Sequence, residues 1–229
     1  MGHRGAAGLE PENTLLSIRR AIDLGVDEVE VDIRMSGDGY PVIIHDETVD
    51  RTTDGHGYVR DLSLEEIRLL DAGKGERVPT LDEVFDVALG RVKLQLELKV
   101  PEALEPVVEA VRERGAEGEV LITSFIHHLL ADAYRIDPEV ETGAIFPDAP
   151  PDIFERTLRV NAGWVLVNHR SVDARLVVEA HERGLKIGAW TPDMVGDMRR
   201  VVLLGVDEVG TNRPDLLIGL LRSMGLRNL

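Results

Sequence analysis

The chain has 229 residues, of which 43% are hydrophobic, so it can bury a core of the size found in one large α/β domain. Its 42 acidic residues outnumber 26 Lys and Arg, and the net charge of −16 argues against a nucleic-acid partner. The lack of cysteine excludes disulfides, thiolate metal sites and thiol nucleophiles. No apolar stretch approaches the ~20 residues that cross a bilayer, and no secretory leader is apparent, so we expect a cytoplasmic protein without a membrane span.

The informative part of the chain starts almost at its first residue. Residues 2–5, Gly-His-Arg-Gly, leave hardly any chain in front of them to form a strand, so we expect the natural chain to begin upstream of Met1. Apolar residues then recur at helical spacing, which predicts a helix over residues 13–24 that ends at Gly25.

Residues 28–34 alternate strictly between charged and apolar side chains. This period of two predicts a strand whose apolar face packs on helices. Its opposite face carries Glu30, Asp32 and Arg34. Alternation alone is also typical of a solvated edge strand, so the functional interpretation depends on the rest of the chain.

A hairpin is expected directly after this strand. Asp38-Gly39 is a strong turn signal between two strand-like runs, and so short a connection requires an antiparallel return strand. With these two residues as the loop, Ile33 pairs with Ile44 and Asp32 pairs with His45. The predicted register therefore brings an imidazole beside two carboxylates.

The segment after the hairpin differs in composition. Residues 46–80 are rich in Thr, Asp and Gly and contain a short helical piece at 64–70. A segment of this length is too short for a core of its own, so we expect an insertion between barrel elements. We therefore predict a single domain over residues 1–229 with an insertion at about 46–80.

From residue 80 onward, strands and helices alternate. Thr80 and Glu83 open a helix as a capping box. Further helices are expected at 101–114, up to about 136, from 151, at 174–184, up to 204 and from 214, and strands at 92–99, 120–125, 140–146, 164–168, 186–191 and 206–211. With a first strand ending at His3 and the strand at 28–34, these strands predict a closed (β/α)₈ TIM barrel with an extra hairpin strand. The alternative, an open doubly wound sheet, is disfavoured because no Gly-rich nucleotide loop follows the first strand.

Three carboxylates are expected to meet at the carboxyl ends of the barrel strands, where barrel enzymes carry their catalytic groups. These are Glu30, Asp32 and Glu97. Carboxylates so close together cannot all stay ionised unless a positive charge compensates them. A set of ligands made only of oxygen favours Mg²⁺ or Ca²⁺, with Mn²⁺ as a further candidate. The alternative is an internal salt-bridge network with the nearby basic residues Arg4, Arg34 and Lys99.

Two histidines are placed near these carboxylates by the same pattern. Imidazole titrates near neutral pH, so His3 and His45 can act as base and acid in one turnover. The bland alternative for any one histidine is a structural residue in the core or at the surface.

The chain resembles the glycerophosphodiester phosphodiesterase family in short motifs that follow the family's order over nearly its whole length. The matching segments are His3-Arg4-Gly5, Pro11-Glu12-Asn13-Thr14, Glu30-x-Asp32, His45-Asp46 with Arg51-Thr52-Thr53, Glu97-x-Lys99, Ser124-Phe125, Trp190-Thr191, Gly205-Val206-Asp207 and Thr211-Asn212-Arg213-Pro214. The resemblance implies a barrel, a divalent metal held by Glu30, Asp32 and Glu97, catalysis by His3 and His45, and an insertion at 46–80.

Two positions depart from the family's usual pattern. Asn212 stands where the family commonly has Asp, which keeps an acceptor oxygen but loses the charge. Pro192-Asp193 follows Trp190-Thr191 where the family usually has an apolar residue and Asn.

The reaction implied is metal-dependent hydrolysis of glycerophosphodiesters to sn-glycerol 3-phosphate and an alcohol. Arg4 and Lys99 would hold the phosphodiester together with the metal. One of His3 and His45 would take a proton from the nucleophile, either water or the glycerol 2-hydroxyl, and the other would protonate the leaving alcohol. Trp190 is expected to pack on the substrate's carbons, with simple packing of the barrel mouth as its alternative.

Two other functions are weighed against this one. A lysophospholipase D would use the same residues but needs an apolar lip, which only residues 145–147 and 125–126 offer. A non-catalytic barrel that binds a small molecule is disfavoured because both histidines and all three carboxylates are present. The sequence leaves the oligomeric state open.

Overall fold

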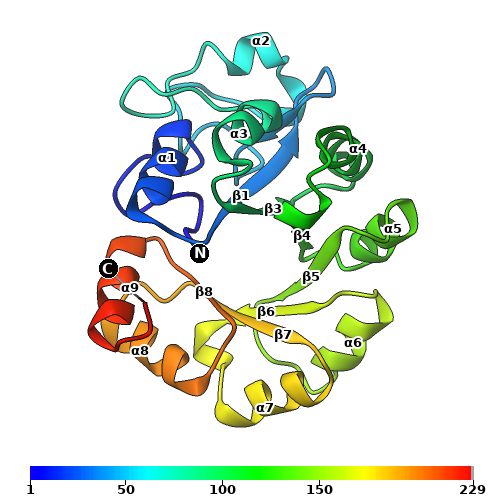
Figure 1. The fold of residues 1–229 in the computed structure, drawn as a ribbon. Helices are drawn as coiled ribbons and strands as arrows, with labels where there is room; N and C mark the ends of the chain where they lie inside the picture. The colour runs from blue at the N-terminus through cyan, green and yellow to red at the C-terminus, as the bar shows by residue number, and fades with distance from the viewer. Residues whose placement is uncertain (228–229) are drawn as a thin grey trace.

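The computed structural model describes residues 1–227, which form a ring of helices around a curled sheet that is parallel except for one edge strand (Figure 1). The sheet follows the order β2-β1-β3-β4-β5-β6-β7-β8. Its strands are β1 (Glu28–Met35), β2 (Pro41–Ile43), β3 (Lys93–Leu98), β4 (Val120–Ser124), β5 (Glu141–Phe146), β6 (Trp164–Asn168), β7 (Lys186–Trp190) and β8 (Glu208–Gly210). The helices are α1 (Leu15–Leu24), α2 (Leu64–Ile67), α3 (Leu81–Ala88), α4 (Leu104–Arg114), α5 (His128–Ile136), α6 (Ile153–Arg159), α7 (Ala174–Glu182), α8 (Val195–Leu204) and α9 (Pro214–Ser223). The predicted TIM-barrel fold is confirmed.

The barrel closes through a single residue near the start of the chain. Gly2 forms parallel bridges to Val29 of β1 and to Thr211, directly after β8. A Cβ at Gly2 would lie 2.5 Å from the Gly5 carbonyl oxygen, so only glycine fits this position without a shift. The first predicted strand is therefore reduced to one bridging residue, which delivers His3 to the mouth of the barrel.

The side chains of the barrel strands alternate between the two faces of the sheet, as the sequence pattern predicts. In β3, Leu94, Leu96 and Leu98 point outward into the core between sheet and helices and are at most 1% exposed. The side chains between them point into the barrel, which is how Gln95 and Glu97 come to be buried. The main core thus lies between the strands and the ring of helices, and the barrel interior holds polar side chains such as Gln95 and Glu97 beside Ile145 and Leu166.

The helix boundaries follow from the capping residues. The Thr14 side chain accepts a hydrogen bond from the Ser17 amide at the start of α1, and Gly25 ends the helix with φ +86°. Thr80 and Glu83 form the predicted capping box at α3. The predicted helical piece at 64–70 is shorter, since α2 ends at Ile67. Within residues 1–227, no helix combines the length and apolar character needed to span a bilayer.

The predicted hairpin register was wrong by one residue. Ile33 pairs with Ile43 rather than Ile44, and the Ile44 amide donates to the Asp32 carbonyl at 3.0 Å. The loop has three residues, 37–39, because the Ser36 amide bonds the Tyr40 carbonyl and Gly39 takes φ +87°. His45 therefore lies past the end of the ladder instead of facing Asp32.

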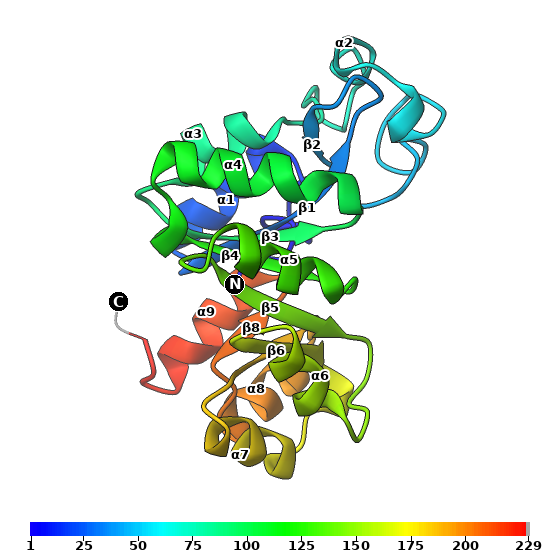
Figure 2. The ribbon, with the colours of Figure 1, turned by 90° about the vertical axis from the view of Figure 1, so that its right-hand side faces the viewer.

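The insertion projects from one side of the ring (Figures 1 and 2). It contains a 3₁₀ turn at Val59–Asp61 and the short α2. Under it lies a small apolar cluster, separate from the main core and shared with β2, made of Val42, Ile44, Val49, Val59, Ile67, Ala72 and Val78. The segment thus has a few buried apolar contacts of its own, and its membership of one domain with the barrel stays a prediction.

Candidate active site

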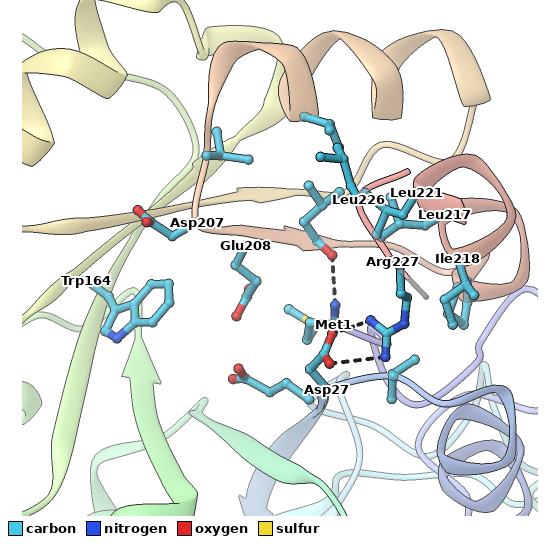
Figure 3. Close-up of a pocket in the computed structure, with 16 residues that line it drawn as sticks. Met1, Asp27, Trp164, Asp207, Glu208, Leu217, Ile218, Leu221, Leu226 and Arg227 are labelled. Atoms are coloured by element: carbon cyan, nitrogen blue, oxygen red, sulfur yellow. Dashed lines mark hydrogen bonds and ion pairs between the residues drawn. The ribbon is translucent and has the colours of Figure 1, made fainter. Parts of the chain in front are cut away.

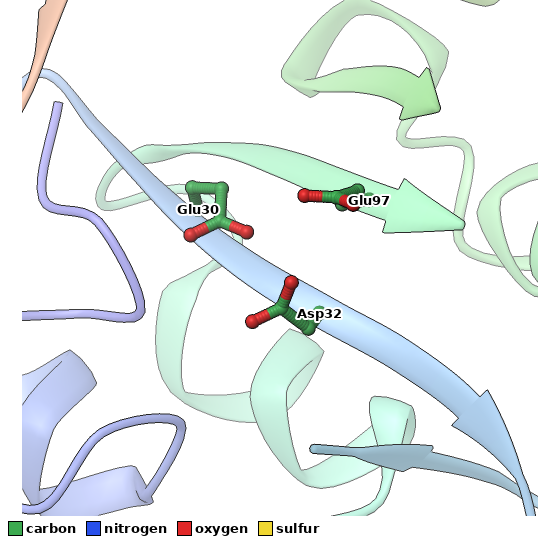
Figure 4. Close-up of side chains that lie close together, drawn as sticks. All are labelled: Glu30, Asp32 and Glu97. Atoms are coloured by element: carbon green, nitrogen blue, oxygen red, sulfur yellow. The ribbon is translucent and has the colours of Figure 1, made fainter. Parts of the chain in front are cut away.

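Three buried carboxylates converge on the barrel axis (Figure 4). Glu30 and Asp32 lie on the inward face of β1, and Glu97 lies on β3 in direct register with Asp32. One ligand oxygen from each residue lies within 4.8 Å of the others. The side chains are nearly inaccessible, since Glu30 is 1%, Asp32 0% and Glu97 8% exposed. The strand alternation seen in the sequence has brought these groups together.

Two basic side chains contact this cluster. Lys99, directly after β3, places Nζ 2.5 Å from Glu97 Oε1 and 3.3 Å from Asp32 Oδ1. Arg4 Nε lies 3.2 Å from Asp32 Oδ2, and its backbone amide donates to Glu30 Oε2 at 2.8 Å. Part of the salt-bridge network considered as an alternative therefore exists. The two cations leave one of the three carboxylates uncompensated.

Arg34, the third basic residue of that alternative, has another partner. Its Nε donates to the backbone carbonyl of His45 at 2.8 Å. Within the described part of the chain, its guanidinium forms no ion pair. Arg34 therefore helps to position the segment that carries His45.

Burial and mutual repulsion separate the pKa values of the three carboxyl groups. Burial, followed by the charge of Asp32, raises the pKa of Glu30 to about 8. The same two causes raise the pKa of Glu97 to about 7. Burial opposes ionisation of Asp32 too, but Lys99 and Arg4 together hold its pKa below the usual range. Without a further cation, the cluster holds protons near neutral pH.

The cluster contains carboxylate oxygens that no hydrogen bond satisfies. Glu30 Oε1 and Asp32 Oδ1 are buried, and neither accepts a hydrogen bond among residues 1–227, although Lys99 Nζ lies 3.3 Å from Asp32 Oδ1 as an ion pair. Asp32 Oδ2, by contrast, accepts a bond from Asn13 Nδ2 at 2.8 Å. A buried acceptor without a donor costs free energy, and carboxylate oxygens of this kind are the ligands that a hard divalent cation prefers. The donor set fits Mg²⁺, Ca²⁺ or Mn²⁺.

His3 lies at the edge of the cluster. Its Nε2 is 3.9 Å from Glu30 Oε2, and its Nδ1 forms a 2.8 Å hydrogen bond with Asn212 Oδ1. Burial, and then the neighbouring charge of Arg4, lowers its pKa. His3 is therefore held as a neutral imidazole with one nitrogen turned toward the carboxylates.

His45 reaches the cavity from the other side. Its Nδ1 bonds Asp46 Oδ1 at 2.6 Å, and Asp46 is clamped in turn by Arg51, whose hydrogen bonds hold the pKa of Asp46 far below its usual range. Arg51 also bonds Glu12, which contacts Arg4 at 2.8 Å. Burial lowers the pKa of His45 despite the attraction of Asp32 and Asp46. A continuous polar network thus links both histidines to the carboxylate cluster.

A cavity of about 290 Å³ opens above these groups at the carboxyl ends of the strands. Of the predicted site residues, seven line it: His3, Arg4, Glu30, His45, Glu97, Lys99 and Trp190. The eighth, Asp32, lies fully buried against the same groups. Part of the cavity wall is aromatic, because Trp190 and Phe125 both line it and contact each other edge to face with ring centroids 5.8 Å apart.

Two residues of the predicted apolar lip are buried. Ile145 and Phe146 are 4% and 1% exposed, since Ile145 points into the barrel and lines the cavity, whereas Phe146 points the other way into the main core. Phe125 is 43% exposed and is the aromatic part of the proposed lip that remains. The surface expected for a lipid-bearing substrate is therefore smaller than the sequence suggested.

A second cavity, of about 340 Å³, lies at the amino ends of the strands (Figure 3). Met1, Trp164 and Glu208 are among the residues that line it, and none of the eight predicted site residues does so. Barrel enzymes place their chemistry at the carboxyl ends of the strands, so the 290 Å³ cavity is the candidate active site.

Comparison with known proteins agrees with this geometry. The sequence model of the glycerophosphoryl diester phosphodiesterase family matches residues 3–216. The chain belongs to this family. A glycerophosphodiester phosphodiesterase of Caldanaerobacter subterraneus subsp. tengcongensis is 37% identical over 98% of both chains. The predicted family and the prediction of an enzyme are confirmed.

Solved structures of the family superpose closely on this chain. A phosphodiesterase of Oleispira antarctica, in complex with the product sn-glycerol-3-phosphate, has a TM-score of 0.91 and 30% identity over 96% of this chain and 95% of its own. A glycerophosphodiester phosphodiesterase of Agrobacterium tumefaciens has a TM-score of 0.83 and 31% identity over 94% and 96% of the two chains.

Several residues in contact with the site were not assigned a role from the sequence. Asn13, which bonds Asp32, was noticed only as part of a family motif, and it needs a left-handed backbone with φ +58°. Asn212 and Asp193, the two departures from the family pattern, are bonded to one another at 2.7 Å. These residues lie on loops, where no periodicity points to a shared location.

Proposed function

We propose that this protein hydrolyses glycerophosphodiesters to sn-glycerol 3-phosphate and an alcohol. The observation that carries the proposal is the convergence of three buried carboxylates, two basic side chains and two histidines on one small cavity in a member of this family. The Oleispira antarctica relative, solved with sn-glycerol-3-phosphate, supports the same product. A cavity of about 290 Å³ suits a small molecule.

Glu30, Asp32 and Glu97 would hold one divalent cation. Bound there, the cation supplies Lewis-acid chemistry that stabilises negative charge on the phosphoryl oxygens. The unsatisfied oxygens of Glu30 and Asp32 are the feature of this chain that favours such a ligand. The three carboxylates must be ionised to bind it, so the cation competes with the protons held by Glu30 and Glu97.

The basic residues and histidines would perform the remaining work. Arg4 and Lys99 bind the non-bridging oxygens and orient the diester. One histidine takes a proton from the nucleophile as the new bond to phosphorus forms, and the other donates a proton to the alcohol oxygen as its bond to phosphorus breaks. Trp190, with Phe125 against it, offers an apolar wall for the carbons of the substrate.

The test is release of glycerol 3-phosphate from glycerophosphocholine by metal-stripped protein, with Mg²⁺, Ca²⁺ or Mn²⁺ added back. We expect product only with metal, and none from His3→Ala or His45→Ala although both variants stay folded. His181→Ala is the matched control, because His181 is exposed and pairs with Asp207 away from the cavity. Near-normal rates in either site variant would rule out the two-histidine scheme.

The same assay separates the other two functions. Activity on lysophosphatidylcholine but not on glycerophosphocholine would favour a lysophospholipase D. No turnover of either substrate with any metal, together with binding of glycerol 3-phosphate, would favour a non-catalytic module.

A further inference from the structure

His3 is the end of a short chain of hydrogen bonds that begins at Asp193. Asp193 follows β7 in the loop before α8, and Asn212 follows β8. Asn212 Nδ2 bonds Asp193 Oδ2 at 2.7 Å, and Asn212 Oδ1 bonds His3 Nδ1 at 2.8 Å. Two loops that are far apart from residue 3 in the sequence thus meet at one imidazole.

The direction of each bond in this chain follows from the chemistry of its first member. A carboxylate can only accept hydrogen bonds. Asp193 accepts three: from the Thr211 hydroxyl at 2.9 Å, from the Asn212 amide at 2.9 Å and from the Asn212 side chain. The side-chain NH₂ of Asn212 must therefore face Asp193, and its carbonyl oxygen must face His3.

The amide in turn selects the tautomer of the imidazole. Because Asn212 presents an oxygen, His3 Nδ1 must carry the hydrogen, and Nε2 of the neutral ring keeps its lone pair. Nε2 is the nitrogen that lies 3.9 Å from Glu30 Oε2, on the cavity side. The acceptor needed by a general base thus points at the site.

We propose that Asp193 is a positioning residue, which acts through Asn212 to hold His3 in the tautomer with hydrogen on Nδ1. The inference rests on the proposed role of His3 in proton transfer. His45 reaches the same arrangement more directly, because its Nδ1 bonds the Asp46 carboxylate. In both histidines Nδ1 is therefore bonded to an oxygen acceptor, the Asn212 amide for His3 and the Asp46 carboxylate for His45.

The substitution Asp193→Asn tests this series of hydrogen bonds at its first member. The introduced amide has one oxygen, which the Thr211 hydroxyl and the Asn212 backbone amide both require, so its NH₂ group would face the NH₂ of Asn212. Relief of this clash turns the Asn212 side chain over and directs a donor at His3 Nδ1. We expect His3 to change to the tautomer with hydrogen on Nε2.

The second variant, Asp193→Asn with Asn212→Asp, reverses the order of the two groups. The introduced carboxylate at 212 accepts from both its neighbours, so hydrogen returns to Nδ1 of His3. Asp215→Asn is the matched control: it removes the same charge three residues after Asn212, at a carboxylate whose ion-pair partner among residues 1–227 is Arg213.

The readouts are the ¹⁵N shifts of the His3 ring at a pH where it is neutral, and kcat and KM measured separately. For Asp193→Asn we expect the tautomer change and a fall in kcat on the order of 10²-fold with little change in KM. The double variant recovers the wild-type tautomer and most of kcat, and Asp215→Asn behaves as wild type.

Two outcomes would overturn the proposal. They are an unchanged tautomer in Asp193→Asn, whether or not kcat falls, and a double variant that keeps the tautomer of the single one. If the single variant does not fold, the tautomer of His3 in the double variant tests the proposal, because that variant keeps the same number of hydrogen bonds between residues 193, 212 and His3. Activity in His3→Ala would contradict the proposed function, whereas the ¹⁵N shifts would still report whether Asp193 sets the tautomer.

Discussion

Metal binding to the carboxylate cluster should release protons, and the number released should depend on pH. The pKa values of about 8 for Glu30 and about 7 for Glu97 leave both groups protonated at pH 6. A divalent cation needs all three carboxylates ionised, so we expect about two protons to leave per ion at pH 6 and fewer than one at pH 8. The apparent affinity should then rise by roughly 500-fold between these two pH values.

Isothermal titration calorimetry measures this number directly. Titration of metal-stripped protein with Mg²⁺ or Mn²⁺ in two buffers of different ionisation enthalpy gives the protons released per ion. Glu97→Gln should lower the count at pH 6 to about one, since one titrating ligand is removed. Glu102→Gln, an exposed carboxylate outside the cavity, should leave it unchanged.

One result would refute the reasoning. Equal affinity at pH 6 and pH 8 without proton release would mean that all three carboxylates are already ionised in the free protein. Arg4 and Lys99 would then be sufficient partners, and the cluster would be the salt-bridge network considered at the outset.

Three further predictions concern the groups around the cluster. The unfolding free energy of the metal-free protein should fall as pH rises from about 5 to 8, because Glu30 and Glu97 have raised pKa values in the folded state and stay protonated there, whereas in the unfolded state they are ionised. Denaturant titration with and without Mn²⁺ measures this fall and whether the metal offsets it. Asn13→Ala should cost about 1–3 kcal/mol in urea unfolding, because it strips a donor from buried Asp32. Asp46→Asn should lower kcat by about 10- to 100-fold with the fold intact by circular dichroism, because the Nδ1 partner of His45 loses its charge.

The parts of the site that lie on strands could be read from the sequence. A strand with one face packed on helices must turn every second residue inward, so alternation in β1 and β3 places Glu30, Asp32 and Glu97 on one surface. Counting strands then places their carboxyl ends together. Burial of apolar side chains determines both the orientation of each strand and the packing of the helices on the sheet, and the hydrophobic pattern of the sequence shows which side chains are buried.

Loop geometry was harder to obtain. Asp38-Gly39 satisfies both a two-residue hairpin turn and the end of a three-residue loop. A two-residue type I′ turn would need a positive φ at both residues, whereas here Gly39 has φ +87° and Asp38 does not have a positive φ. The predicted register of β2 therefore differed by one residue from the register in the structure. Asn13 and Asp193 were not assigned for a related reason: each contacts a partner 19 residues away in the sequence, and no local pattern encodes such a contact.

The balance of charge in the cavity also bears on which molecules it favours. The three buried carboxylates exceed Arg4 and Lys99 by one negative charge. Beside them Arg51 pairs with both Glu12 and Asp46, which adds a second negative charge. A divalent cation would cancel these two charges, with both histidines neutral. A phosphodiester monoanion would then add one negative charge to the site, whereas glycerol 3-phosphate, largely a dianion near neutral pH, would add two. The proposed site therefore accommodates the charge of the substrate better than that of the product, which favours product release.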